Sequence, residues 1–231
     1  MHCTHALPAV LLLSLAFPIA ARSQGIAVDE GRFAIEIAGR SVGTEDFTIR
    51  RAGIGRDDAF FANAVITQGA SVDRQEITPL LRATPPSGVV AGYQVKVTGR
   101  DPLDFQMTLV GQRYVAIARS QRGDEEREFP ARETTRILDR DVAHHYYFLR
   151  DAREGERIHV IEPRTRTQTT LIVERRSEDE LTLDGRTTPA RRLEFNVDEQ
   201  VRIAWYDRLG RVLRVEIPAL GYVAERTDLV G

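Results

Sequence analysis

Apolar and polar residues alternate along most of this chain of 231 residues. Residues 33–37 carry phenylalanine or isoleucine at every second position, and residues 47–49 do the same after a connection over Gly39 to Gly43. Consecutive side chains of a strand point to opposite faces of a sheet, so this period of two predicts a β-hairpin with one buried and one exposed face. The same period returns in six later segments, 93–97, 105–109, 114–118, 193–197, 201–205 and 213–217.

Short turns separate these segments. Asp184-Gly185 lies between two of them, and Asp207 to Gly210 lies between two others. Asp-Gly is suited to the left-handed dihedral angles of a tight hairpin turn. Because the strands are joined by turns rather than by helical crossovers, we expect one antiparallel sheet. The sequence therefore predicts an all-β fold, an antiparallel meander of about a dozen strands curled into a half-open barrel.

Residues 137–152 interrupt the alternation. Apolar side chains recur there at helical spacing, at positions 142, 146 and 149, and Asp139 or Asp141 could cap the start of a helix. A single amphipathic helix within a meander must bury its apolar stripe against the sheet. We therefore expect one short helix on the concave side, where it could plug or cover a cavity.

The N-terminus has the pattern of an export signal. An apolar run from Ala6 to Ala20 is followed by Ala21-Arg22-Ser23, which fits a signal-peptidase site. We expect residues 1–23 to be a signal peptide and residues 24–231 to form a single β-rich domain that is periplasmic or extracellular. A buried N-terminal helix is the alternative, and it would have to accommodate the two prolines of the apolar run.

Composition narrows the classes of function. Cys3, the only cysteine, lies in the predicted signal, so the mature chain has no disulfide and no thiolate metal site. The 32 basic residues are scattered among 34 acidic ones, which give a net charge of −2. Nucleic-acid binding normally shows a clustered basic face, so it is not predicted. No segment after the signal is long and apolar enough for a transmembrane span.

The candidate catalytic and metal-binding residues do not form a convincing set. Ser41 lies in a Gly-x-Ser-x-Gly pattern, but within a predicted hairpin turn rather than between a strand and a helix. Asp141, His144 and His145 are close in sequence, and His159 lies in a later strand. Two ligands on one helix do not make a zinc site. We therefore assign no catalytic residue, no metal and no cofactor.

Four residues are candidates for contact with a ligand. Glu45 shares strand parity with Phe47, which would place its carboxylate on the buried face, although a position at the strand end is the favoured interpretation. Tyr146 and Leu149 lie on the predicted helix, and Trp205 is expected on the buried face of its strand. Such side chains either line an apolar pocket or fill the core.

The last third of the chain resembles an uncharacterised group of secreted bacterial β-proteins. The resemblance is carried by a strand and Trp-Tyr-Asp turn at Val201 to Asp207, a strand and proline bend at Gly210 to Pro218, and a final segment at Gly221 to Arg226. The expected architecture is also similar to the half-open barrel of the outer-membrane lipoprotein carriers, LolA and LolB. That resemblance implies binding of an apolar ligand in the cell envelope.

Together these observations predict an exported, non-catalytic envelope protein that binds a lipid or other apolar molecule in the concave face of its sheet. The alternative is a structural or assembly module of the envelope that has a filled core and acts on a partner protein through its surface. A hydrolase is the third hypothesis, because no nucleophile, base and stabilising group are brought together by the sequence.

Overall fold

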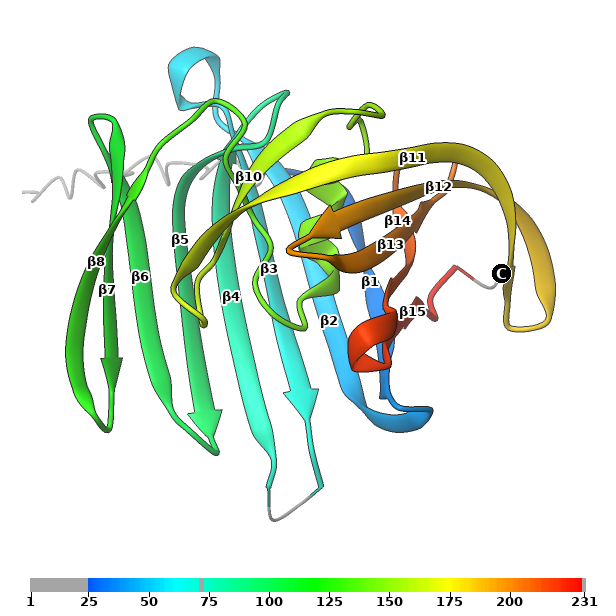
Figure 1. The fold of residues 1–231 in the computed structure, drawn as a ribbon, viewed down its shortest axis with the longest axis horizontal. Helices are drawn as coiled ribbons and strands as arrows, with labels where there is room; N and C mark the ends of the chain where they lie inside the picture. The colour runs from blue at the N-terminus through cyan, green and yellow to red at the C-terminus, as the bar shows by residue number, and fades with distance from the viewer. Residues whose placement is uncertain (1–24, 71–72, 230–231) are drawn as a thin grey trace, which may run out of the picture.

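The computed structural model describes residues 25–70 and 73–229, and the predicted signal peptide lies outside this range (Figure 1). Within it, fifteen strands form one continuous sheet. The strands are β1 (Ile26–Ile37), β2 (Arg40–Ala52), β3 (Ala59–Gln68), β4 (Gln75–Thr84), β5 (Val89–Gly99), β6 (Leu103–Val110), β7 (Arg113–Ser120), β8 (Gly123–Pro130), β9 (Arg136–Ile137), β10 (Arg157–Glu162), β11 (Thr167–Leu183), β12 (Arg186–Val197), β13 (Gln200–Tyr206), β14 (Val212–Ile217) and β15 (Tyr222–Arg226). Three 3₁₀-helices are η1 (Gly55–Asp57), η2 (Ala143–Leu149) and η3 (Pro218–Leu220).

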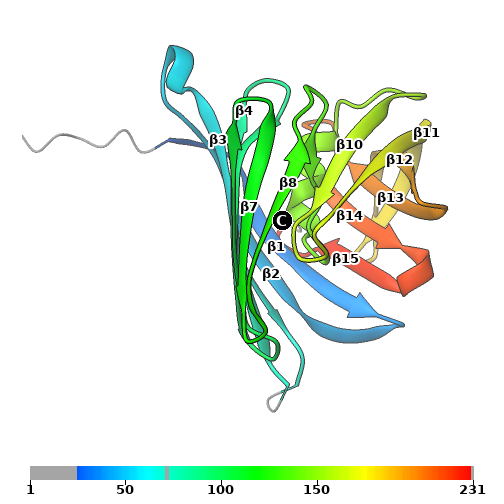
Figure 2. The ribbon, with the colours of Figure 1, turned by 60° about the vertical axis from the view of Figure 1, so that its left-hand side comes forward.

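The sheet consists of two meanders joined edge to edge. Its order is β8-β7-β6-β5-β4-β3-β2-β1-β15-β14-β13-β12-β11-β10-β9, so the first strand pairs with the last. All neighbouring strands are antiparallel except β9 and β10. Figure 2 shows that the two meanders curl toward each other around η2. The expected all-β half-open barrel with one short internal helix is therefore confirmed, with more strands than the dozen expected.

The two edges of the sheet are not joined by backbone hydrogen bonds, and side-chain contacts bridge the gap between them. Edge strand β8 faces the β10–β11 hairpin, where Arg166 forms an ion pair with Glu125 at 2.7 Å. The side-chain amide of Gln168 donates to the carbonyl of Pro130 at 2.9 Å. Side-chain contacts of this kind are weaker than a strand ladder, so this seam is the least continuous part of the wall.

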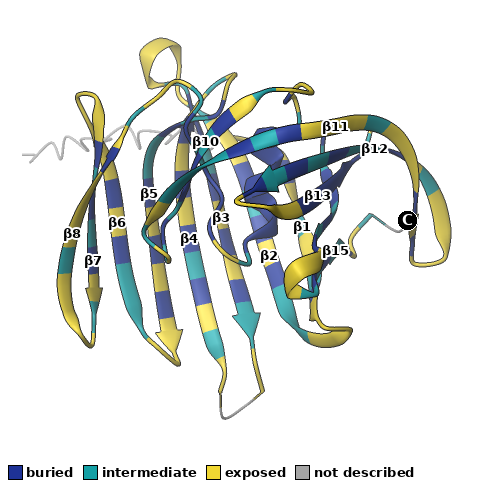
Figure 3. Ribbon diagram, in the orientation of Figure 1, coloured by how far each residue is buried: buried dark blue, intermediate teal, exposed yellow. Residues whose placement is uncertain are grey.

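The core lies between the two meanders. One hydrophobic cluster includes residues of both halves together with η2, and all seven residues of η2 are buried (Figure 3). The expected amphipathic helix is therefore wrong in one respect, because this segment has no exposed face. The physical reason is its position inside the barrel, where both walls contact it.

The local turn chemistry is confirmed at Asp184-Gly185, where both residues have positive φ, 47° and 75°. The first hairpin differs from its prediction. Its turn is formed by Ala38 and Gly39, and Gly43 lies within β2. The register of the hairpin explains the difference, because Ile37 already pairs with Arg40.

Candidate functional site

Glu45 of β2 holds the start of η2 inside the barrel. Its Oε2 accepts the backbone N–H of Ala143 at 2.8 Å, and its Oε1 accepts the backbone N–H of His144 at 2.9 Å. Oε1 also accepts a hydrogen bond of 2.6 Å from Nδ1 of His144. A buried carboxylate needs such partners, and Glu45 has no exposed surface. It therefore caps a helix that begins 98 residues later in the chain.

The strand-end interpretation of Glu45 is wrong. Glu45 pairs with Phe33 of β1 on one side and with Ile66 of β3 on the other, so it lies well inside the sheet. The side chain consequently shares the buried face with Phe47, whose ring stacks on His144 at 5.7 Å. The expected cap by Asp139 or Asp141 is also wrong, because no side chain of the residue preceding η2 caps it and Glu45 takes that role.

Asp139 organises a second buried group of polar side chains. Its Oδ2 accepts the hydroxyl hydrogen of Tyr93 at 2.7 Å and pairs with Nε of Arg164 at 3.1 Å. Its backbone N–H donates to Nδ1 of His145 at 3.2 Å. Nδ1 is thus the acceptor of a neutral imidazole. Burial is the main cause that lowers the pKa of His145 well below its usual value, and the neighbouring His144 and Arg164 lower it further.

This buried imidazole makes stability depend on pH. The unfolded chain takes up a proton on His145 below about pH 6.5, whereas the folded protein resists protonation. The free energy of unfolding should therefore fall as the pH falls, by up to about 1.4 kcal/mol from this residue between about pH 7.5 and 5.5. Urea denaturation at both pH values measures the loss. His145→Asn should reduce this loss more than His159→Asn does, because the pKa of His145 lies well below its usual value and that of His159 is lowered less. An unchanged loss in His145→Asn would contradict the assignment.

A pocket of about 220 Å³ lies between η2 and the β9–β15 half of the barrel. It lies near the end where η3 joins β14 to β15, which we call the η3 mouth. Its wall combines apolar side chains with charged groups and hydroxyl groups. The apolar residues include Val142, Ile217 and Leu220, and the polar residues include Asp141, Tyr146, Glu162, Arg202 and Tyr222.

Several polar atoms of this pocket are buried without a satisfactory partner. The hydroxyl of Tyr222 and Nε of Arg202 make no hydrogen bond, although Arg202 is ion-paired with Glu162. The hydroxyl of Tyr146 lies beside Arg202 without a hydrogen bond of good geometry. Burial raises the pKa of Asp141, and nearby arginines oppose this shift. Unsatisfied buried polar atoms are rare and need an explanation.

Of the four predicted ligand residues, Tyr146 lines this pocket, whereas Glu45, Leu149 and Trp205 do not. Leu149 is 1% exposed and belongs to the main core rather than to the pocket wall. Trp205 is also buried, but it packs in a second cluster with Leu181, Ile203 and Leu213. Trp205 is therefore buried as expected, but it belongs to the second cluster, because Ala204 and Tyr206 occupy the phase of β13 that faces the main core.

Ser41 lies exposed in β2, away from the strand-to-helix context that a nucleophile elbow needs.

The histidines of the described residues do not form a metal site. In residues 25–70 and 73–229, no three histidine, cysteine, aspartate or glutamate side chains are arranged to hold one. His159 lies on β10 and its Nδ1 hydrogen-bonds to the hydroxyl of Thr134 at 2.8 Å. In the same part of the chain, no helix has the length and apolar character needed to cross a membrane.

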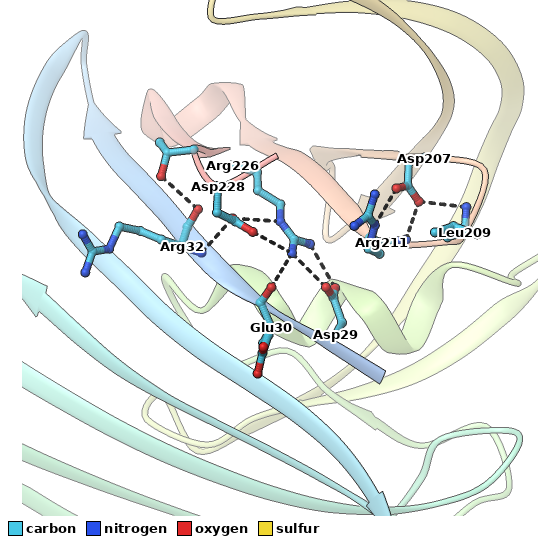
Figure 4. A network of polar contacts seen from close by, with 9 residues as sticks. Asp29, Glu30, Arg32, Asp207, Leu209, Arg211, Arg226 and Asp228 are labelled. Atoms are coloured by element: carbon cyan, nitrogen blue, oxygen red, sulfur yellow. Dashed lines mark hydrogen bonds and ion pairs between the residues drawn. The ribbon is translucent and has the colours of Figure 1, made fainter. Parts of the chain in front are cut away.

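A third polar network joins the two ends of the chain and was not predicted (Figure 4). The buried guanidinium of Arg226 in β15 binds Asp29 of β1 at 2.8 and 3.0 Å and Asp228 at 3.0 Å. The same guanidinium donates to the backbone carbonyl of Glu30. These groups satisfy one another, so the network fastens β1 to β15.

The pocket residues Arg202 and Tyr222 were also not predicted from the sequence. Arg202 lies on the same face of β13 as Ala204 and Tyr206, so an arginine at a buried strand position could have indicated the site. To recognise it, one would have had to know which face of β13 points into the barrel. Tyr222 has the parity of Ala224 and Arg226 in a short last strand, a pattern typical of any buried face.

Comparisons with known proteins place the fold and do not identify the protein. No family model matches the chain, and no curated protein matches it. A solved structure, that of a β-barrel-like protein of the domain of unknown function DUF1849 from Brucella abortus, superposes with a TM-score of 0.53 and 8% identity over 86% of this chain and 94% of that chain. The match supports the expected uncharacterised β-barrel-like class and offers no evidence for a lipoprotein carrier. The chain thus shares a β-barrel-like fold with a protein whose domain has no known function.

Proposed function

We propose that this protein is an exported, non-catalytic binding protein that receives one end of an apolar or amphipathic molecule at the η3 mouth. The observation that carries the proposal is the unpartnered hydroxyl of Tyr222 in a pocket that apolar side chains also line. A buried hydroxyl without a partner is unfavourable by about 1 to 3 kcal/mol. A polar group at the end of a ligand would supply that partner while Val142 and Leu220 contact its apolar part.

The size of the pocket limits how much of a ligand can enter. Its volume of about 220 Å³ is below the roughly 300 to 1,000 Å³ of sites that enclose a whole drug-sized molecule. The barrel interior beside this pocket is occupied by η2, which is held by Glu45 and by the hydrogen bond of 2.9 Å from the Tyr206 hydroxyl to the carbonyl of Tyr146. A bound lipid would therefore extend out of the mouth.

The filled interior also favours the second candidate, a structural or assembly module of the envelope. All seven residues of η2 are buried in the main core, so the barrel does not need a ligand to complete its packing. An enzyme is less well supported. Glu45 and His144 form the carboxylate–imidazole pair common in catalytic sites, but neither has exposed surface through which a substrate could reach it.

Titration with a fluorescent fatty acid tests the binding proposal. Leu220→Trp should fill the pocket and weaken binding at least about tenfold, since a larger side chain leaves no room for the ligand. Tyr222→Phe should weaken binding about fivefold, the effect of one neutral hydrogen bond of about 1 kcal/mol. Leu220 is 41% exposed, so the first change should leave the fold intact.

Two matched variants serve as controls. Leu209→Trp adds the same bulk at a residue that is 77% exposed and outside the pocket. Tyr114→Phe removes a hydroxyl that already donates to the carbonyl of Val90 at 3.0 Å in the main core. Neither should change the affinity for the probe. If the wild-type protein binds no probe, the binding proposal fails and the structural module takes its place.

A further inference from the structure

A larger pocket, of about 640 Å³, lies at the opposite end of the barrel. Pro86 and Ser87 of the β4–β5 turn form part of its wall, together with residues that follow η2. Because β1 ends beside η3 and successive strands of the meander reverse direction, the β4–β5 turn is at the end away from the η3 mouth. This pocket is therefore separate from the proposed ligand site.

The acidic side chains of this pocket have partners, whereas two of its arginines have no carboxylate partner. Its three carboxylates all have partners. Asp151 pairs with Arg150 at 3.4 Å, Glu154 accepts the backbone N–H of Arg176 at 3.3 Å, and Glu156 accepts the backbone N–H of Arg153 at 2.9 Å. The side chains of Arg136 and Arg153 have no carboxylate within 4 Å in the described part of the chain.

Arg136 is the more unusual of the two. Its Nη1 donates only to the carbonyls of Glu133 and Thr135, at 3.2 and 3.0 Å, and its Nε is buried without an acceptor. Burial lowers its pKa, against the attraction of Glu156. Two other arginines with little exposure have a carboxylate partner, since Arg164 pairs with Asp139 and Arg226 with Asp29. Half-buried Arg191 instead donates to the carbonyl of Arg150. A partly buried cation without a carboxylate in direct contact is unfavourable, and an anion would relieve this cost.

We propose that this pocket binds a small oxyanion, a carboxylate or phosphate group, against the guanidinium of Arg136 with Arg153 at its rim. A guanidinium is the side chain best suited to such groups, because its planar array of N–H donors matches their oxygens. The hydroxyl of Ser87 lines the same wall and can donate a further hydrogen bond. This proposal does not depend on a ligand at the η3 mouth.

The test follows the Nε–Hε resonances of the arginines by ¹⁵N NMR while sodium phosphate or sodium acetate is added at constant ionic strength set with chloride. The Arg136 resonance of the wild-type protein should shift to saturation with one or both anions, and the comparison shows whether phosphate or carboxylate is preferred. Arg136→Gln should weaken binding, followed through Arg153, at least about tenfold, because a charge-assisted hydrogen bond is lost. Glu156→Gln should strengthen it.

Arg100→Gln is the matched control, since it removes an exposed arginine outside the pocket and should leave the affinity unchanged. If Arg136→Gln does not fold, Arg136→Lys keeps the charge and should still bind more weakly than the wild type. No saturable shift at Arg136, or an equal response in the Arg136 and Arg100 variants, would overturn the proposal.

Discussion

Replacing Glu45 with alanine is expected to lower the free energy of unfolding by about 3 to 5 kcal/mol, because several buried hydrogen-bond donors lose the group that accepts from them. The change removes three hydrogen bonds at once, from the backbone of Ala143, the backbone of His144 and its imidazole. The two backbone N–H groups would remain in the core without acceptors. Because a domain is stabilised by only about 5 to 15 kcal/mol in total, the variant should be close to unfolding at room temperature.

The neighbouring residue provides a control within the same strand. Asp46 points to the opposite face and pairs with Arg32 at 2.6 Å, where both side chains are about half exposed. Asp46→Ala should therefore cost less than about 1 kcal/mol. Urea denaturation of the two variants measures the difference. Equal losses for Glu45→Ala and Asp46→Ala would show that the buried cap does not stabilise η2.

Replacing Trp205 with alanine is expected to lower the free energy of unfolding by about 3 to 5 kcal/mol, because a large aromatic side chain is removed from a packed cluster. The indole is 7% exposed, its Nε1–H donates to Asp179 at 3.1 Å, and the guanidinium groups of Arg192 and Arg214 lie 5.5 and 5.9 Å from its ring centroid. Asp179 belongs to β11, so the loss should also weaken the contact between the β11–β12 hairpin and β13.

Val201→Ala in the same strand is the matched control, since Val201 is 36% exposed, and its effect should stay within about 0.5 kcal/mol. The denaturation midpoint reports the loss for each variant. A midpoint and slope for Trp205→Ala that equal those of the wild type would show that the second cluster does not contribute to stability.

Much of the fold could be predicted because strand periodicity and turn chemistry are local. The strand around Tyr93, the Asp184-Gly185 turn and the internal helix all appear where the sequence placed them. The predicted number of strands was lower than the fifteen observed because some strands do not show alternating apolar and polar residues. Strand β4 contains Pro79, which has no N–H to donate to a neighbouring strand and so argues against a strand in the sequence. Strand β8 buries only Phe129 and therefore shows no alternation.

The site was less predictable because its parts come from distant segments. Parity could place Glu45 on the buried face, but its partner His144 lies 99 residues away and no local pattern links the two. The cluster to which Trp205 belongs could not be predicted for a different reason. Residues 202–206 of β13 are all buried, so alternation in that strand does not reveal which side chains face the main core and which face the second cluster.

The pairing of β1 with β15 has a consequence for how this protein reaches its native state. Phe33 aligns with Arg226, so the ladder that unites the two halves joins segments at opposite ends of the chain. Each meander can form from its own hairpins, which join strands close in sequence. The pairing of β1 with β15 joins residues far apart in sequence, so it should form late in folding. Until β15 has joined the sheet, β1 presents an unpaired edge. A partly folded chain in this state is therefore exposed to edge-to-edge aggregation.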